Sequence, residues 1–136
     1  MKIEACGYEG EGLSRVYEND GWMVAVKNWK PANDLEGIDC LERHNKTDEL
    51  FVLLAGRCVL LSAVEKPGGD LEFQAVPMEP GMLYKIPRGL LHNTVTRRDT
   101  KLLLVEAPDT SMENSEVTSL DESQRTVVRG LARTGL

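Results

Sequence analysis

The feature that most limits the fold of this chain is a series of short β-prone segments separated by turn-forming residues. Such segments are predicted over residues 22–29, 49–55, 57–65, 71–76, 83–87, 92–97 and 101–106. Gly, Pro, Asn and Asp interrupt the series, as in Asn19-Asp-Gly21 and Lys66-Pro-Gly-Gly-Asp70, and these residues favour tight turns. Short strands at roughly ten-residue spacing, with no helix between them, are typical of an antiparallel sandwich or barrel. The sequence therefore predicts an all-β fold.

The two ends of this series differ from it. Residues 30–40 show no periodicity and are predicted to form a connection, and residues 107–117 are polar and irregular. Ser119-Leu-Asp-Glu122 then matches a capping box, which is typical of a helix start. Four apolar residues that follow would share one helical face: Leu120, Val127, Val128 and Leu131. We expect a short C-terminal helix packed on the barrel.

Length and charge restrict the class of protein. A chain of 136 residues fits one domain, with the barrel expected over about 13–107 and the tail and helix over about 108–136. The net charge of −6 argues against nucleic acid or an anionic membrane as partner, since both need a basic face. No apolar run reaches the ~18 residues of a membrane span, and the first residues lack the apolar stretch of a secretory signal. We therefore expect a cytoplasmic protein.

The cysteines form no recognisable site. Cys6, Cys40 and Cys58 are an odd number at wide spacing, without a CxxC pair. This pattern fits neither a disulfide framework nor a thiolate zinc site. Cys58 lies in an apolar run and is predicted to be a small buried side chain.

The only two histidines of the chain each lie in a spaced motif. The later motif is Gly-x5-Pro-x-Gly-x2-His, formed by Gly81, Pro87, Gly89 and His92. The glycines and the proline shape the turns on either side of a short strand, and His92 begins the next strand. Residues 92, 94 and 96 share a face by strand alternation, so we expect His92 to point into the barrel.

The earlier motif surrounds the other histidine. His44 precedes Glu49 by five residues, and Gly56 follows Glu49 by seven. Glu42 lies two residues before His44. The 24 residues between Gly56 and Gly81 suit a two-stranded hairpin.

Together, in this order, the two motifs resemble those of the cupin superfamily. The chain departs from the family pattern in three places. Glu42 replaces the first histidine, the leading glycine at Gly37 is one residue closer than expected, and Thr96 stands where the family has asparagine. The resemblance implies a cupin jelly-roll β-barrel, a divalent metal ion in the barrel mouth, and a homodimer.

The ligands that the resemblance implies are His44, Glu49 and His92. Two imidazoles and one carboxylate leave open positions on a cation for water, O₂ or substrate. Glu42 occupies the fourth ligand position of the family and would either coordinate the metal or act beside it as a general base. Such a donor set suits Fe, Mn, Zn or Ni. The alternative is a barrel without metal, in which these polar groups simply hydrogen-bond one another.

Two classes of function that involve a ligand fit these features, and a third interpretation is a purely structural dimer. The first is a small metal-binding cupin, acting as a dioxygenase, isomerase or lyase on a small polar metabolite. The second is a non-catalytic cupin that binds a small molecule or acts as a sensor, without a functional metal. Cupins use one site for many reactions, so the motifs do not select a substrate.

Overall fold

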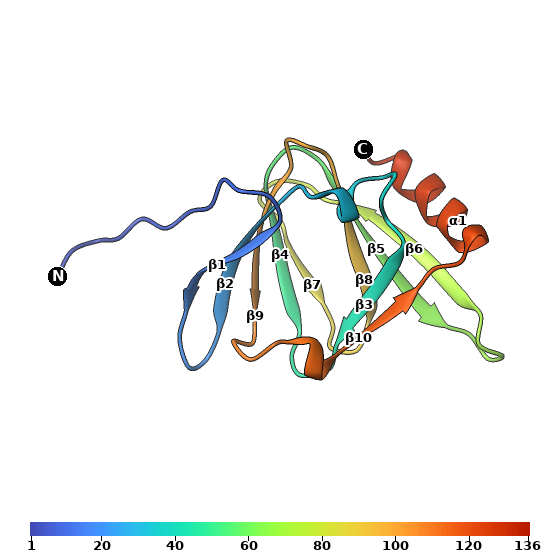
Figure 1. The fold of residues 1–136 in the computed structure, drawn as a ribbon, viewed down its shortest axis with the longest axis horizontal. Coiled ribbons are helices and arrows are strands. Elements are labelled where there is room, and N and C mark those ends of the chain that lie inside the picture. Colours follow the sequence, from blue (N-terminus) through green and yellow to red (C-terminus); the bar gives the residue numbers. More distant parts are fainter.

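The computed structural model describes all 136 residues. Its ten strands form two five-stranded sheets that face each other as the walls of a barrel (Figure 1), and every paired strand is antiparallel to its neighbour. Sheet A contains, in spatial order, β1 (Leu13–Glu18), β2 (Met23–Asn28), β9 (Lys101–Glu106), β4 (Glu49–Ala55) and β7 (Leu83–Ile86). Sheet B contains β10 (Ser115–Ser119), β3 (Cys40–His44), β8 (Leu91–Thr96), β5 (Cys58–Glu65) and β6 (Leu71–Pro77).

All seven predicted strands are confirmed to within two residues at each end. Three strands were missed, namely β1, β3 and β10. The prediction of an irregular tail over 107–117 is therefore wrong in part, because β10 pairs with β3 and extends sheet B. These strands lack apolar alternation for a physical reason. β10 lies at the edge of its sheet, and one face of β3 carries Glu42 and His44 toward a polar cavity.

The C-terminal helix α1 (Glu122–Arg133) is present, but its predicted cap is wrong by two residues. The N-cap is Asp121, whose carboxylate accepts a hydrogen bond of 2.8 Å from the backbone N–H of Gln124. The Gln124 side chain in turn accepts one of 2.9 Å from the N–H of Asp121. Ser119 is instead the last residue of β10. Because β10 extends to Ser119, the helix cap lies two residues later than predicted.

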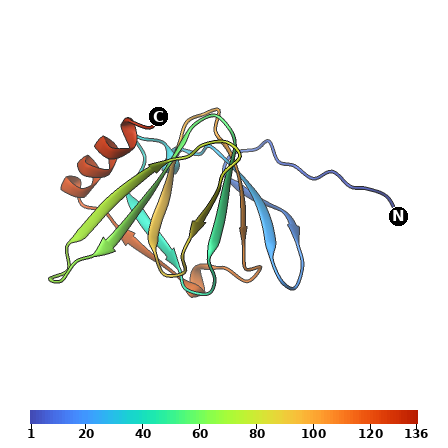
Figure 2. The ribbon, with the colours of Figure 1, turned by 180° about the vertical axis from the view of Figure 1, so that it is seen from behind.

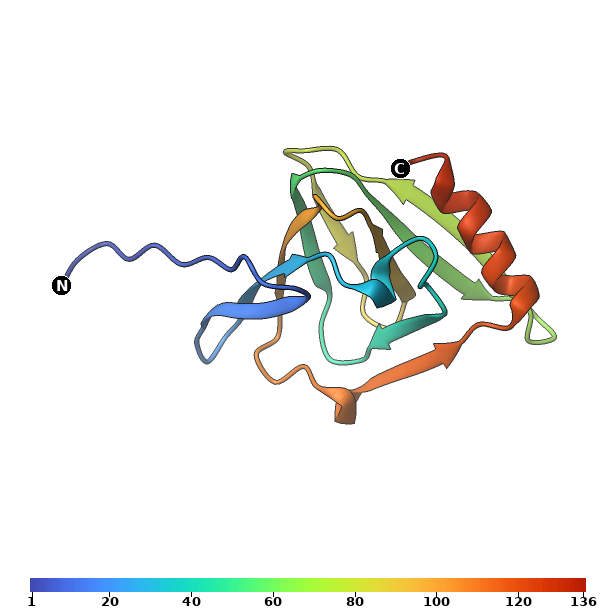
Figure 3. The same ribbon diagram turned by 45° about the horizontal axis from the view of Figure 1, so that its top comes forward.

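Helix α1 lies across the outer face of sheet B, against β5 and β6, as Figures 2 and 3 show. Its buried residues are Val128 and Ala132. Val127 and Leu131, which were predicted to lie on the packed face, are 48% and 38% exposed. The helix is thus rotated relative to the predicted face, because a shallow contact with one sheet buries only a narrow stripe.

Apolar side chains gather in two layers. One lies between the sheets and contains Met23, Ala25, Phe51, Leu53, Cys58, Leu60, Met78, Ile86, Leu102 and Leu104. The other lies between sheet B and α1 and contains Leu35, Ile38, Leu41, Val59, Leu61, Ala63, Leu91, Val95, Leu120, Val128 and Ala132. Because sheet B is covered on both faces, every residue of β8 is buried. The inner layer stops short of one end of the barrel, where the lining becomes polar.

The remaining segments are short. The N-terminal segment extends away from the barrel without strand pairing (Figure 1). Near its end, the backbone carbonyls of Tyr8 and Gly10 accept hydrogen bonds from the Asn28 side chain on β2. Two single-turn 3₁₀ helices, Pro31–Asn33 and Met112–Asn114, interrupt the loops after β2 and β9. A membrane-crossing helix would have to be longer and more apolar than any helix of this chain.

Candidate metal centre

A cavity of about 230 Å³ opens where the inner faces of the two sheets become polar. His44, Glu49, His92 and Glu42, the four residues predicted as metal ligands, all line it. They come from β3 and β8 of sheet B and from β4 of sheet A. Strand alternation therefore brings together side chains that are up to fifty residues apart in the chain.

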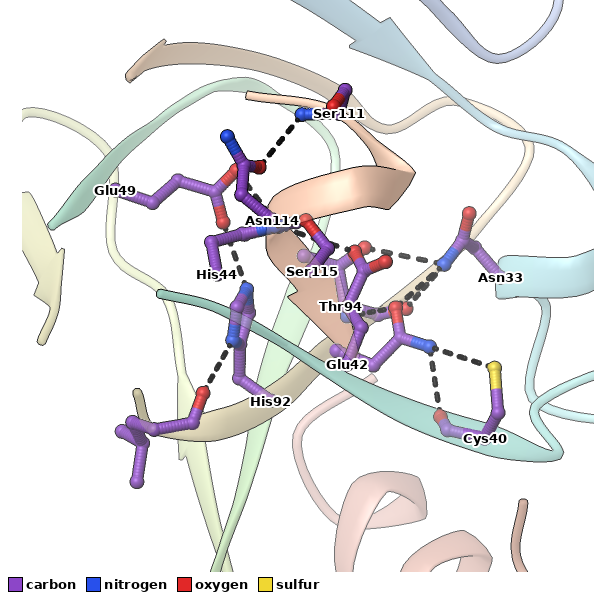
Figure 4. A network of polar contacts seen from close by, with 12 residues as sticks. Asn33, Cys40, Glu42, His44, Glu49, His92, Thr94, Ser111, Asn114 and Ser115 are labelled. Atoms are coloured by element: carbon purple, nitrogen blue, oxygen red, sulfur yellow. Dashed lines mark hydrogen bonds and ion pairs between the residues drawn. The ribbon is translucent and has the colours of Figure 1, made fainter. Parts of the chain in front are cut away.

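His92 is held at both ring nitrogens. Its Nδ1 donates a hydrogen bond of 2.9 Å to the backbone carbonyl of Leu90, and its Nε2 is hydrogen-bonded to Glu49 Oε1 at 2.8 Å. Since a carbonyl oxygen can only accept a hydrogen bond, Nδ1 carries the hydrogen. The other ring nitrogen, Nε2, faces the cavity and Glu49. Figure 4 shows this chain of contacts, with the imidazole between the backbone and the carboxylate.

His44 is oriented in the same way by a different partner. Its Nδ1 lies 2.7 Å from the hydroxyl Oγ of Ser115 on β10. Its Nε2 lies 3.9 Å from Glu49 Oε2 and 3.7 Å from Glu42 Oε1. The rings of His44 and His92 meet nearly edge to face, with centroids 5.5 Å apart. Both Nε2 atoms thus approach the same carboxylate, while a separate hydrogen-bond partner holds Nδ1 of each ring, as is common for metal-binding histidines.

Cross-strand pairing explains these positions. Glu42 pairs directly with His92 across β3 and β8, and Ser115 pairs with His44 across β10 and β3. On sheet A, Leu50 pairs with Val105, and continuing this antiparallel register by one residue places Glu49 opposite Glu106. Side chains of directly opposed residues lie about 4.5–5.5 Å apart at Cβ and so interact.

Glu106 is the site residue that the motifs missed. It lines the cavity and forms a possible ligand cluster with His44 and Glu49, whereas Glu42 clusters with His44 and His92. Its Oε2 atom is buried without a hydrogen-bond donor. The one sequence signal for Glu106 was the alternation along β9, which turns Leu102 and Leu104 inward. That signal was weak because it does not identify the strand that pairs with β9.

The carboxylates of the site differ in proton affinity. Burial raises the pKa of Glu106 to about 8, and its hydrogen bond with Glu49 adds to this. Pairing with His44 lowers the pKa of Glu42. Burial opposes the ionisation of Glu49, but the hydrogen bonds with His92 and Glu106 outweigh it and lower its pKa. At neutral pH, Glu42 and Glu49 are therefore ionised and Glu106 holds a proton.

The pKa of His44 is raised, mainly by its pairing with Glu42, while burial opposes the shift. Lys27 on β2 also lines the cavity, and burial lowers the pKa of its ammonium group. The sequence pattern did not indicate Lys27 as a site residue, because a lysine in a strand is usually exposed.

Other residues near the motifs lie outside the site. Thr96 is buried as expected, but its hydroxyl donates to the backbone carbonyl of Asn33 at 3.3 Å, and Thr94 lines the cavity instead. Asp48 is exposed and accepts a hydrogen bond from the Arg88 N–H. Cys58 is buried as predicted, and burial raises the pKa of its thiol to about 12. None of these groups is placed to bind a cation.

Solved structures resemble this fold, although no family model and no curated protein matches the chain. A single-residue variant of Streptomyces Pac13 with uridine matches at a TM-score of 0.59 and 12% identity, over 91% of this chain and 98% of that chain. Pac13 is a nucleoside dehydratase. CapF with the inhibitor 3-isopropenyl-tropolone matches at 0.57 and 19% identity, over 86% of this chain and 34% of CapF. A cupin superfamily protein from Desulfitobacterium hafniense DCB-2 matches at 0.51 and 15% identity, over 75% and 84%.

Identities this low carry information on the fold and not on activity. The matches nevertheless extend over most of the chain, and the two antiparallel sheets confirm the predicted jelly roll. Both histidine motifs also lie where the strands converge on the cavity. The chain therefore has the fold of the cupin superfamily.

Proposed function

We propose that this chain is a metal-dependent cupin that binds a small polar metabolite in its barrel cavity and catalyses a proton-transfer reaction of the isomerase or lyase type. His44, Glu49 and His92 would hold a divalent cation, with Glu42 as the fourth ligand. One observation carries the proposal. Two imidazoles, each fixed at Nδ1 by Ser115 or Leu90, direct Nε2 toward the same buried carboxylate.

The donor geometry fits a metal after small movements. Ligand atoms about 2.1 Å from one cation lie roughly 3.0–3.4 Å apart in octahedral or tetrahedral geometry. The distances from Nε2 to carboxylate oxygen are 2.8 Å for His92–Glu49, 3.9 Å for His44–Glu49 and 3.7 Å for His44–Glu42. Each differs from the required range by a few tenths of an ångström, which side-chain rotation supplies. A metal ion would replace the short hydrogen bond between His92 Nε2 and Glu49 Oε1 by separate bonds to the cation.

The divalent ion would act as a Lewis acid toward a substrate oxygen. Glu106 supplies the proton transfer. Its carboxyl group is protonated at neutral pH and faces the cavity, and a pKa of about 8 suits a group that gives and takes a proton near neutrality. Phe51 and Leu104 form apolar parts of the wall and restrict water. The role of Glu106 favours isomerase or lyase chemistry over dioxygenation, and the similar fold of Pac13, a nucleoside dehydratase, supports this choice.

Elemental analysis of protein purified without a metal-affinity tag tests this function. We expect about one equivalent of Fe, Mn, Zn or Ni per chain, since the donor set suits these metals. His92→Ala should lose the metal. Val95→Ala is the matched control, because Val95 is a neighbouring buried residue on β8 whose side chain lies in the outer layer. It should reduce stability but keep the metal.

Unchanged metal content and thermal stability in His92→Ala would overturn the metal centre. The second candidate, a cupin that binds a small molecule without metal, would then be favoured, because the cavity and its polar lining do not depend on a cation.

A further inference from the structure

One cation is buried inside the barrel. Lys27 is 8% exposed, and no other lysine or arginine of the chain is buried. It follows Met23 and Ala25 at alternate positions of β2, so the three side chains share the inner face. Lys27 also lines the same cavity as His44 and Glu49. Its ammonium group therefore belongs to the space that a substrate would enter.

This ammonium group has no partner within the protein. Lys46 pairs with Asp109, and Lys101 pairs with Glu9 and with the carbonyl of Tyr8. Lys27 takes part in no ion pair within 4.0 Å and donates no hydrogen bond, although Glu42 and Glu49 act on it through their charges at longer range. A buried charge without a partner is costly. A bound ligand that brings an acceptor would remove that cost.

We propose that Lys27 binds the carboxylate of a small organic acid, which is the substrate or ligand of the cavity. This inference rests on the proposed function, because the opposite end of the same molecule would meet the metal centre. Lys27 pairs with Leu102 on β9, and Met23 pairs with Glu106. Four residues along a strand span roughly 13 Å. The side chains of Lys27 and Glu106 thus leave sheet A at backbone positions that are roughly 13 Å apart.

The charged groups that line the cavity determine which kind of acid it would bind. Besides Lys27, the charged or titratable groups of the cavity are Glu42, His44, Glu49, His92 and Glu106. No arginine lines it, so a phosphate would lack the bidentate partner that it commonly uses. The two ionised glutamates, Glu42 and Glu49, would also repel a dianion more strongly than a monoanion. The volume of about 230 Å³ is below the ~300–1,000 Å³ of drug-sized sites, which favours a short molecule with one free carboxylate.

Acids and their uncharged amides test whether Lys27 binds a carboxylate. Hydroxycarboxylic acids of three to six carbons, their primary amides and inorganic phosphate would be titrated into the metal-loaded protein by calorimetry, with metal content measured in parallel. We expect at least one acid to bind tenfold or more tightly than its amide and than phosphate. Lys27→Met should reduce this preference to within about threefold with unchanged metal content, and Lys27→Arg should restore part of it. The Met variant removes the charge while keeping the length of the side chain.

Three results would overturn the proposed binding of a carboxylate by Lys27. These are amides that bind as tightly as acids, a preference for acids over amides that Lys27→Met retains, or no binding of any acid at about 10 mM. The comparison of acids with their amides uses only the wild-type protein, so it remains valid even if a variant fails to fold. Failure of the proposed function looks different. The protein would then lack stoichiometric metal while the preference for acids, and its loss in Lys27→Met, persisted.

Discussion

His92 on sheet B and Glu49 on sheet A form a hydrogen bond of 2.8 Å across the barrel, so the candidate metal centre also connects the two sheets. Both side chains are almost fully buried, at 3% and 7% exposed. A buried pair of this kind is costly to break from one side, because the remaining group keeps its charge and loses its partner. Function and folding stability are therefore coupled at this contact, and variants of the site need controls for both.

The two additional carboxylates are expected to have different roles. Glu42→Gln should weaken metal binding at least tenfold, a loss of about 1.4 kcal/mol or more, because it removes an ionised ligand. Glu106→Gln should leave metal affinity within about threefold, since its carboxyl group holds a proton at neutral pH. Competition with a chromophoric chelator measures both affinities. Glu116→Gln on exposed β10 is the control. The opposite order of effects would make Glu106 the ligand and Glu42 the proton carrier.

Ser115 is expected to position His44 for metal binding. Its hydroxyl lies 2.7 Å from His44 Nδ1, and removing such a partner commonly reduces metal affinity 10–100-fold. Ser115→Ala should show a loss of this size in the same chelator assay. Ser119→Ala provides a matched control, because Ser119 is an exposed serine on the same strand. Equal effects of the two substitutions would show that the loss comes from β10 as a whole.

The metal-free protein should become less stable as the pH rises from about 5.5 to about 8.5. The folded state raises the pKa of Glu106 from 4.5 to about 8, so it binds more protons than the unfolded state in this range. Stability then falls with increasing pH. The raised pKa of His44 acts in the same direction above its unfolded value of 6.5.

Thermal unfolding in the presence of a chelator measures this dependence, and we expect Tm to fall by a few degrees. Glu106→Gln should show a smaller fall, because the amide does not titrate. A fall in Tm of equal size in the wild type and in Glu106→Gln would contradict the assigned protonation state of Glu106.

The glycines of the two motifs should tolerate substitution unequally. Gly56 has φ of +71°, and a Cβ atom there would lie 2.7 Å from the Asp99 carbonyl oxygen and 2.9 Å from Thr100 Cα. Gly56→Ala should therefore destabilise the fold by about 3 kcal/mol or more, from backbone strain and steric overlap together. Gly81 has a similar φ of +84° but no atom within 4 Å of such a Cβ. Gly81→Ala should cost only about 1–2 kcal/mol. Denaturant unfolding measures both, and equal losses would contradict the role of the Asp99 contact.

The sequence by itself determined the fold class and most of the strands. β-prone runs and turn residues recur along the chain wherever a strand faces an apolar layer, as in residues 49–55 and 101–106. It also determined which residues approach the cavity, because the motif spacing fixes the strand faces of His44, Glu49 and His92. The start of helix α1 was less well determined, since two overlapping capping patterns compete and only the end of β10 decides between them.

Only the tertiary structure decided which further side chains join the site. The sequence does not specify strand register, yet the pairing of β4 with β9 places Glu106 opposite Glu49, and the pairing of β10 with β3 places Ser115 beside His44. Lys27 reads as a surface lysine until β2 is known to turn it inward. Local patterns record the alternation of one strand, whereas a site between two sheets depends on how several strands are aligned with one another.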